Sequence, residues 1–214
     1  GRLATKYNQN IAAWDVSNVT EMDVMFYRAD GFNQPVGAWN VSAVTNMRQM
    51  FWRAKAFNQP LERWNVSNVR TMREMFAEAS SFNQPLNDWD VSNVQDMREM
   101  FSKASSFNQP LDRWDVSNVT DMGYMFCEAV SFRQPVTAWR LTRSQSPRCM
   151  FIRLPDYRDM ESRGMCVAAA RGESMEYDLK DAGGICGGEA GCDALLEYRE
   201  QYEHAEGGQT QKMH

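Results

Sequence analysis

The sequence contains few of the residues that enzymes most often use for catalysis. Only two of its 214 residues are histidines, His204 and His214, and both lie near the end of the chain. The five cysteines form no Cys-x-x-Cys pair, which argues against a zinc site. A serine without a neighbouring general base is not an activated nucleophile. We therefore expect no enzymatic activity, no cofactor and no bound metal ion.

The chain also lacks a long apolar run and an excess of positive charge, and these two absences exclude several classes of partner. No apolar run approaches the roughly 18 residues that a membrane-spanning helix requires. The net charge of −5 provides no basic surface for nucleic acid or anionic lipid. We expect neither a nucleic-acid partner nor a membrane span in this segment. The chain starts with Gly-Arg and carries no signal peptide, and its start falls inside a repeat, so we expect that it was cut from a longer protein.

Methionine and tryptophan are abundant instead, with 15 and 7 copies, because the chain is built from a 25-residue repeat. Residues 82–106 and 107–131 agree at 17 of 25 positions without a gap. Five full units are followed by a degenerate sixth, and they begin at Tyr7, Phe32, Phe57, Phe82, Phe107 and Phe132. A repeat of this length is typical of stacked repeat proteins, in which neighbouring units share one core.

Each unit shows two hydrophobic patterns. Trp89 and Val91 flank Asp90 with a period of two, which predicts a short half-buried strand. Met97, Met100, Phe101 and Ala104 follow at the spacing of one helical face, and Asp96 with Glu99 has the spacing of a capping box. The strands are predicted to be parallel and centred on Asp15, Asn40, Asn65, Asp90, Asp115 and Arg140. The predicted fold class is therefore α/β, a leucine-rich-repeat-like solenoid with a short parallel β-sheet on one face and short helices on the other.

The unit FNQPLxxWDVSNVTDMxxMFxxA resembles the repeat of BspA-like leucine-rich-repeat surface proteins. The resemblance covers residues 7–151 and implies a secreted or surface-exposed protein that adheres or binds a partner, with no enzymatic activity. The usual asparagine of the signature is replaced by Val94 and its equivalents. An asparagine ladder is therefore expected in the bend instead, through Asn8, Asn33, Asn58, Asn83 and Asn108, and Arg133 interrupts that column.

The repeat array is predicted to occupy residues 1–157 and a cap or tail to occupy residues 158–214. The second segment carries 6 Lys and Arg against 12 Asp and Glu, and it contains a glycine-rich stretch. We expect residues 158–205 to cover the open end of the sixth unit. If the protein is extracellular, disulfides can form among Cys149, Cys166, Cys186 and Cys192. Reduced thiols in a reducing compartment are the equal alternative.

The candidate binding surface is the exposed strand column, Asp15, Asn40, Asn65, Asp90 and Asp115, because this face of a leucine-rich-repeat-like protein is the one that partners usually use. A solvated polar face with no partner is the plainer interpretation of the same column. Trp52 and Tyr124 are added as contact candidates on the helical side, where the units differ most. The methionine and tryptophan columns are interpreted as core rather than as a copper site or a carbohydrate platform.

The leading functional hypothesis is a non-enzymatic protein-interaction or adhesion module of a cell-surface or secreted protein, with a protein or carbohydrate partner. The alternative is a structural or scaffolding subunit in a larger complex. A contact role predicts variation on the exposed columns, whereas a spacer predicts uniform exposed columns. The strand column is uniform and the helical side varies, so the sequence leaves this choice open.

Overall fold

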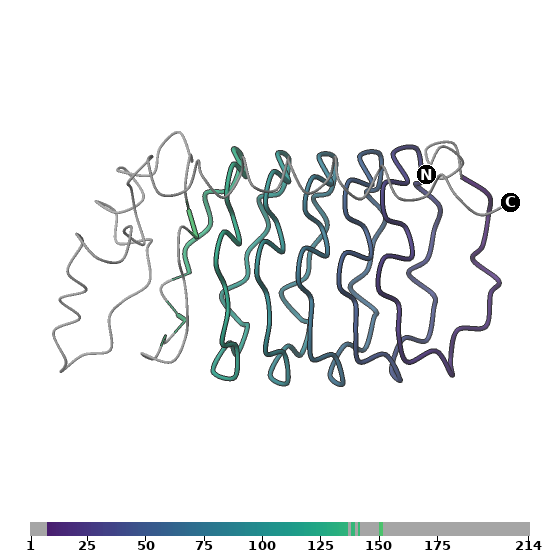
Figure 1. The fold of residues 1–214 in the computed structure, drawn as a ribbon, viewed down its shortest axis with the longest axis horizontal. Helices are drawn as coiled ribbons and strands as arrows, with labels where there is room; N and C mark the ends of the chain where they lie inside the picture. The colour runs from purple at the N-terminus through teal and green to yellow at the C-terminus, as the bar shows by residue number, and fades with distance from the viewer. Residues whose placement is uncertain (1–7, 137, 140, 142–149, 152–214) are drawn as a thin grey trace, which may run out of the picture.

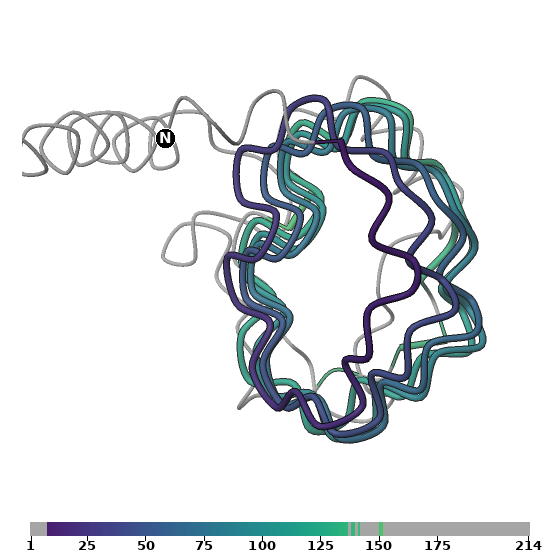
Figure 2. The same ribbon diagram turned by 90° about the vertical axis from the view of Figure 1, so that its right-hand side faces the viewer.

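The computed structural model describes residues 8–136, 138–139, 141 and 150–151. The described residues of each 25-residue unit lie on one coil, and the coils lie side by side in a stack (Figure 1). Viewed along the stack, the coils follow nearly the same path, except that the first, drawn in dark purple, departs from the others on one side (Figure 2). We number the coils from 1 to 6, and they start at residues 7, 32, 57, 82, 107 and 132.

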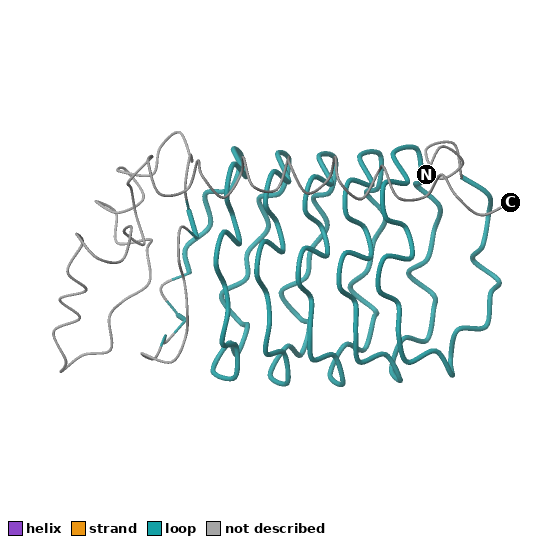
Figure 3. Ribbon diagram, viewed as in Figure 1, coloured by secondary structure: helices purple, strands orange, loops and turns teal. Residues whose placement is uncertain are grey.

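The expected α/β architecture is wrong. The described residues contain no helix and no extended strand (Figure 3). They pair only through isolated parallel bridges, Glu21 with Asn46, Asn46 with Thr71, Thr71 with Asp96, and Asp96 with Asp121. These bridges lie six residues after the predicted strand centres in each coil. No part of the described chain forms a helix that could cross a membrane.

Two tight turns replace the predicted strand. In coil 4 the Trp89 N–H donates to the Leu86 carbonyl at 3.1 Å, and the Val94 N–H donates to the Val91 carbonyl at 2.9 Å. Both bonds span three residues, as in β-turns. The turns place Trp89, Val91 and Val94 in the core, so the apolar alternation arises from successive turns rather than from an extended chain.

The predicted helix over residues 97–104 is also absent, because its amides bond elsewhere. Four of them donate to carbonyls of coil 5 at 2.7–2.9 Å, those of Met97, Glu99, Phe101 and Lys103. Three donate to the carbonyl three residues earlier, those of Met100, Ser102 and Ala104. The Arg98 N–H donates to the Asp96 side chain at 2.9 Å. All eight amides are thus satisfied without the bonds of an α-helix.

This segment needs left-handed backbone conformations at residues that are not glycine. In coil 4 these are Glu99, with φ of 56°, and Lys103, with φ of 58°. The equivalent residues of the other described coils are Val24, Arg28, Gln49, Arg53, Glu74, Glu78, Tyr124 and Glu128. A left-handed residue costs about 1–2 kcal/mol. In coils 1 to 4 the same residues donate bonds to the next coil, each worth about 0.5–1.5 kcal/mol, and the conformation buries the flanking Met and Phe side chains.

The core consists of columns of equivalent side chains, as the repeat predicts. Trp64 lies on Trp89 with ring centroids 6.4 Å apart and planes 3° apart. In the column of repeated tryptophans, each buried indole N–H also donates to a carbonyl of the preceding coil at 2.9–3.2 Å; these residues are Trp39, Trp64, Trp89, Trp114 and Trp139. The methionines at positions 47, 50, 72, 75, 97, 100, 122 and 125 are fully buried, which confirms their assignment to the core.

The expected asparagine ladder is confirmed. The side-chain oxygen of Asn83 accepts the Asn108 N–H at 2.9 Å and the Gln109 amide at 3.1 Å. The same backbone bond recurs at 2.8–3.0 Å between all neighbouring coils, with Asn8, Asn33, Asn58, Asn83 and Asn108 as acceptors. Arg133 ends the column of side chains, but its N–H still donates to Asn108 at 2.8 Å.

Several expectations concern residues outside the described part of the chain. These are the predicted boundary at residue 157, the cap over residues 158–205, the strand centre at Arg140, and Cys149, Cys166, Cys186 and Cys192. The fifth cysteine, Cys127, is buried beside the core of coil 5.

Candidate binding surface

The predicted surface column is exposed, but it is a column of turns. We call it the Asx row, and its members are Asp15, Asn40, Asn65, Asp90 and Asp115. In coils 1 to 5 the Oδ1 atom accepts the N–H of the serine two residues later, at 3.0–3.2 Å. This bond is an Asx turn, which fixes the side chain against its own backbone. The five side chains therefore present their remaining polar atoms in the same orientation along the stack.

Serine hydroxyls add a second hydrogen bond to three members of the Asx row. The hydroxyls of Ser42, Ser67 and Ser92 donate to the Asx oxygen of their own coil at 2.6–2.7 Å. Hydrogen bonds from the Ser92 side chain and backbone hold the pKa of Asp90 below its usual value, and Ser17 does the same for Asp15. The asparagines at positions 40 and 65 supply the same acceptor without charge, which limits repulsion along the row.

A second row of asparagines runs beside the first and ties the coils together. The side-chain amides of Asn68, Asn93 and Asn118 donate to the carbonyls of Ser42, Ser67 and Ser92 in the preceding coil, at 2.7–2.8 Å. Both rows are exposed, but each has a structural bond that holds it in place. The face is thus rigid as well as polar.

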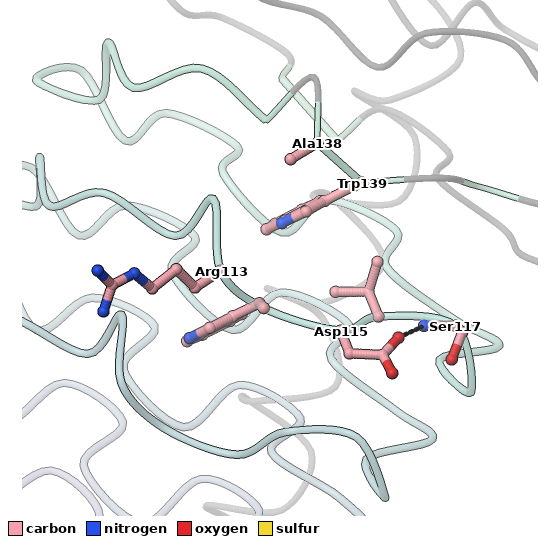
Figure 4. A pocket seen from close by; sticks show the side chains of 7 residues that line it. Arg113, Asp115, Ser117, Ala138 and Trp139 are labelled. Carbon is pink, nitrogen blue, oxygen red and sulfur yellow. Dashed lines mark hydrogen bonds between the residues drawn. The ribbon is translucent and has the colours of Figure 1, made fainter.

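Two hollows interrupt the side of the stack. The first, about 310 Å³, lies between coils 5 and 6 and is lined in part by Arg113, Asp115, Ser117 and Trp139 (Figure 4). Arg113 is bonded to Asp88 at 2.7 Å, and the Ser117 N–H is bonded to Asp115. The Trp139 side chain is only 1% exposed, so this hollow offers polar edges rather than an aromatic platform.

The second hollow, about 320 Å³, lies between coils 2 and 3. Its lining residues are Pro35, Gly37, Ala38, Pro60, Glu62 and Arg63. A Cβ atom on Gly37 would lie 2.5 Å from the Pro60 carbonyl oxygen, so the two coils approach here more closely than a side chain allows.

Two stretches of the chain, residues 2–83 and 59–161, match the family model described as "Mycoplasma protein of unknown function, DUF285". Together they cover more than half of the chain. The chain belongs to this family. No curated protein and no solved structure matches it. Membership of this family supports the conclusion that the chain is a repeat-containing protein, and it assigns no partner or activity.

In this family member Trp52, one of the two contact candidates on the predicted helical side, is buried. Its side chain is 1% exposed, because it stacks on Tyr27 at 4.6 Å and lies beneath Arg28 at 5.3 Å. Tyr124 is 8% exposed and is covered by the Arg98 guanidinium at 5.2 Å. Both residues belong to the segment that was predicted to be helical, and its turns place them under neighbouring arginines. Neither lies on the Asx row.

The same segment carries a network of charged and polar side chains that the sequence pattern did not reveal. The Glu74 carboxylate accepts from Gln49 of coil 2 at 2.9 Å and from Arg73 at 3.1 Å. Burial raises the pKa of Asp96, although its bond from the Arg98 N–H acts in the opposite direction. These groups bind one another across coils, and the described residues contain no group of three or more His, Cys, Asp and Glu side chains that could hold a metal ion.

Proposed function

We propose that this protein is a non-enzymatic protein-interaction or adhesion module of a cell-surface or secreted protein, and that the Asx row with its flanking serines and asparagines is the contact surface. One observation carries the proposal: five exposed polar side chains have the same orientation because each makes the same Asx-turn bond. Side chains that are already ordered lose less conformational entropy on binding.

The chemistry of the face favours a partner that offers many hydrogen-bonding groups. Carboxylates, amides and hydroxyls can bond the backbone and side chains of a protein or the hydroxyls of a carbohydrate. We take a protein as the first candidate, since a row that repeats at every coil can form several equivalent contacts with one extended partner. The resemblance to BspA-like surface proteins supports the same role and the same location outside the cell.

The serines of this face support a non-enzymatic role. The hydroxyls of Ser42, Ser67 and Ser92 donate to the Asx oxygens that form their own turns. Their bonds are therefore part of the fold. Three equivalent serines with the same structural partner also give no distinct reaction centre, whereas catalysis requires a group that is positioned against a substrate.

A substitution at Gln95 tests the contact surface without breaking a turn. Gln95 is exposed beside the row, and coil 3 carries Arg70 at the equivalent position, so Gln95→Arg should fold normally. Binding of the full chain would be measured against immobilised extracellular-matrix proteins and, in parallel, against a glycan array. Gln95→Arg should weaken binding at least tenfold, because arginine is larger and charged. The matched control is Lys55→Arg, an exposed position away from the row.

Two results would contradict the proposal. One is the absence of binding to every protein and glycan tested. The other is binding that responds equally to both substitutions. A structural subunit would instead co-purify in a fixed ratio with the other subunits of its complex and would tolerate Gln95→Arg. Protease treatment of intact source cells tests the location, because a surface protein is cleaved while a cytoplasmic control protein is not.

A further inference from the structure

One asparagine side chain joins coils 4 and 5 on the side of the stack that carries the hollows. The Asn87 side-chain amide donates to the Asp112 carboxylate at 3.0 Å, and its Oδ1 atom accepts the Arg113 N–H at 3.1 Å. The two groups that it bonds belong to adjacent residues of coil 5. A primary carboxamide suits them, because it offers a donor and an acceptor side by side.

The equivalent place between coils 2 and 3 has no such side chain. The residues equivalent to Asn87 and to its two partners are Gly37, Glu62 and Arg63, in that order. No hydrogen bond or ion pair within the described part of the chain involves the Glu62 carboxylate or the Arg63 N–H. Both residues are exposed and line the 320 Å³ hollow. The hollow therefore keeps the two groups that a carboxamide joins one junction further along.

The chain itself cannot fill this hollow from the position of Gly37. A Cβ atom there would lie 2.5 Å from the Pro60 carbonyl oxygen, which is part of the backbone. The other lining residues are Pro35, Ala38 and the ring of Pro60, all of which are exposed. They add an apolar surface beside the acceptor and the donor. An occupant of the hollow must therefore come from another molecule.

We infer that this hollow binds the side-chain carboxamide of an asparagine or glutamine of a partner protein. The carboxamide oxygen accepts the Arg63 N–H, its NH₂ group donates to the Glu62 carboxylate, and its methylene groups contact the prolines. Hydrogen bonds to a charged acceptor are stronger than those between neutral groups. The model for these contacts is the bonding of Asn87 within the chain.

The arrangement selects a primary amide over a secondary one. A trans peptide group directs its N–H and its C=O to opposite sides, so it cannot join two groups on adjacent residues along one edge. The N-acetyl group of a sugar is also a secondary amide. The inference goes beyond the proposed function, because the hollow is lined by residues outside the Asx row and its contacts do not involve that row.

The probe is N-acetyl-asparagine N-methylamide, added to the full chain labelled with ¹⁵N. The Arg63 amide signal should move saturably in the NMR spectrum, and exchange of this amide should slow. N-acetyl-leucine N-methylamide has the same backbone without the carboxamide, and it should leave the Arg63 signal in place. The Gln95→Arg variant should bind the probe normally, so failure of the proposed function and failure of this inference are distinguishable.

Three substitutions locate the site. Glu62→Leu should weaken binding of the probe about tenfold, because it removes a hydrogen bond to a charged group. The matched control is Asp112→Leu, at the equivalent position of coil 5, which should leave the Arg63 response unchanged. Asn87→Gly should make a second hollow of the same kind, so the Arg113 amide should then also respond to the probe.

Four results would overturn the inference. The first is an Arg63 signal that does not move up to the solubility limit of the probe, and the second is an equal response to the leucine compound. The third is an equal response to N-acetylglucosamine, which would make a carbohydrate the occupant. The fourth is an Arg63 signal that moves as the concentration of the chain alone rises, which would make a second copy the occupant.

Discussion

Substitution of Phe101 by alanine should destabilise the middle of the stack strongly. The ring is fully buried and lies 4.0 Å from Phe107, 5.7 Å from both Phe76 and Phe126, and 6.4 Å from Trp114, measured between ring centroids. A Phe→Ala change in a core costs about 3–5 kcal/mol. Aromatic pairs add about 0.5–1.5 kcal/mol each, so four ring neighbours place this residue near the upper end of that range.

The damage should extend beyond coil 4. Phe101 contacts rings of coils 3 and 5, and its N–H donates to Met125 of coil 5 at 2.9 Å. Urea denaturation would give the loss of stability, and hydrogen exchange would locate it. Amides of coils 3, 4 and 5 should all exchange faster, while Phe101→Leu, which leaves a smaller cavity, should show a smaller effect. Faster exchange confined to residues 82–106 would refute a core shared between coils.

Three further outcomes follow from single contacts. Asn83→Ala should lose about 1–3 kcal/mol in urea denaturation, because two donors lose their acceptor, whereas Asn83→Asp keeps the oxygen and should lose less. Burial raises the pKa of Asp96, so the protonated side chain stabilises the fold below its unfolded pKa, and this stability is lost as pH rises through the folded pKa. Asp96→Asn should remove this loss. The urea midpoint should therefore rise more on substitution at pH 7 than at pH 3. Gly37→Ala should lower the melting temperature, because overpacking against Pro60 costs about 1–3 kcal/mol of stability, whereas Ala38→Ser should leave it unchanged.

The sequence predicted the features that arise because equivalent residues of successive units stack on one another. The 25-residue period placed Trp64 on Trp89, the methionines in the core, and the asparagines in a ladder. These features follow from stacking alone, since any regular stack brings equivalent side chains together. The Asx row was predicted to be exposed, and it is, although the turn that holds each member was not foreseen.

The backbone conformation could not be read from the same pattern. The apolar spacing of Met97, Met100 and Phe101 suits a helix, and it suits equally a series of tight turns with left-handed residues between them. Glycine would have indicated such turns, but Glu99 and Lys103 occupy the left-handed positions. Asp96 and Glu99 have the spacing of a helix capping box, but in the structure Asp96 accepts the N–H two residues later and begins a turn instead. The burial of Trp52 was missed for the same reason.

The asparagine ladder has a consequence for how such proteins change over generations. Each rung joins an asparagine oxygen to the backbone N–H of the equivalent residue one coil later, so the bond needs no particular neighbour beyond another coil of the same kind. Even Arg133 can take the donor place. A block of 25 codons can therefore be duplicated or deleted by recombination between near-identical stretches, and the bonds at the new junction are the bonds that were there before. The length of the stack then changes in steps of one coil, roughly 4.8 Å, while the orientation of every exposed row is kept.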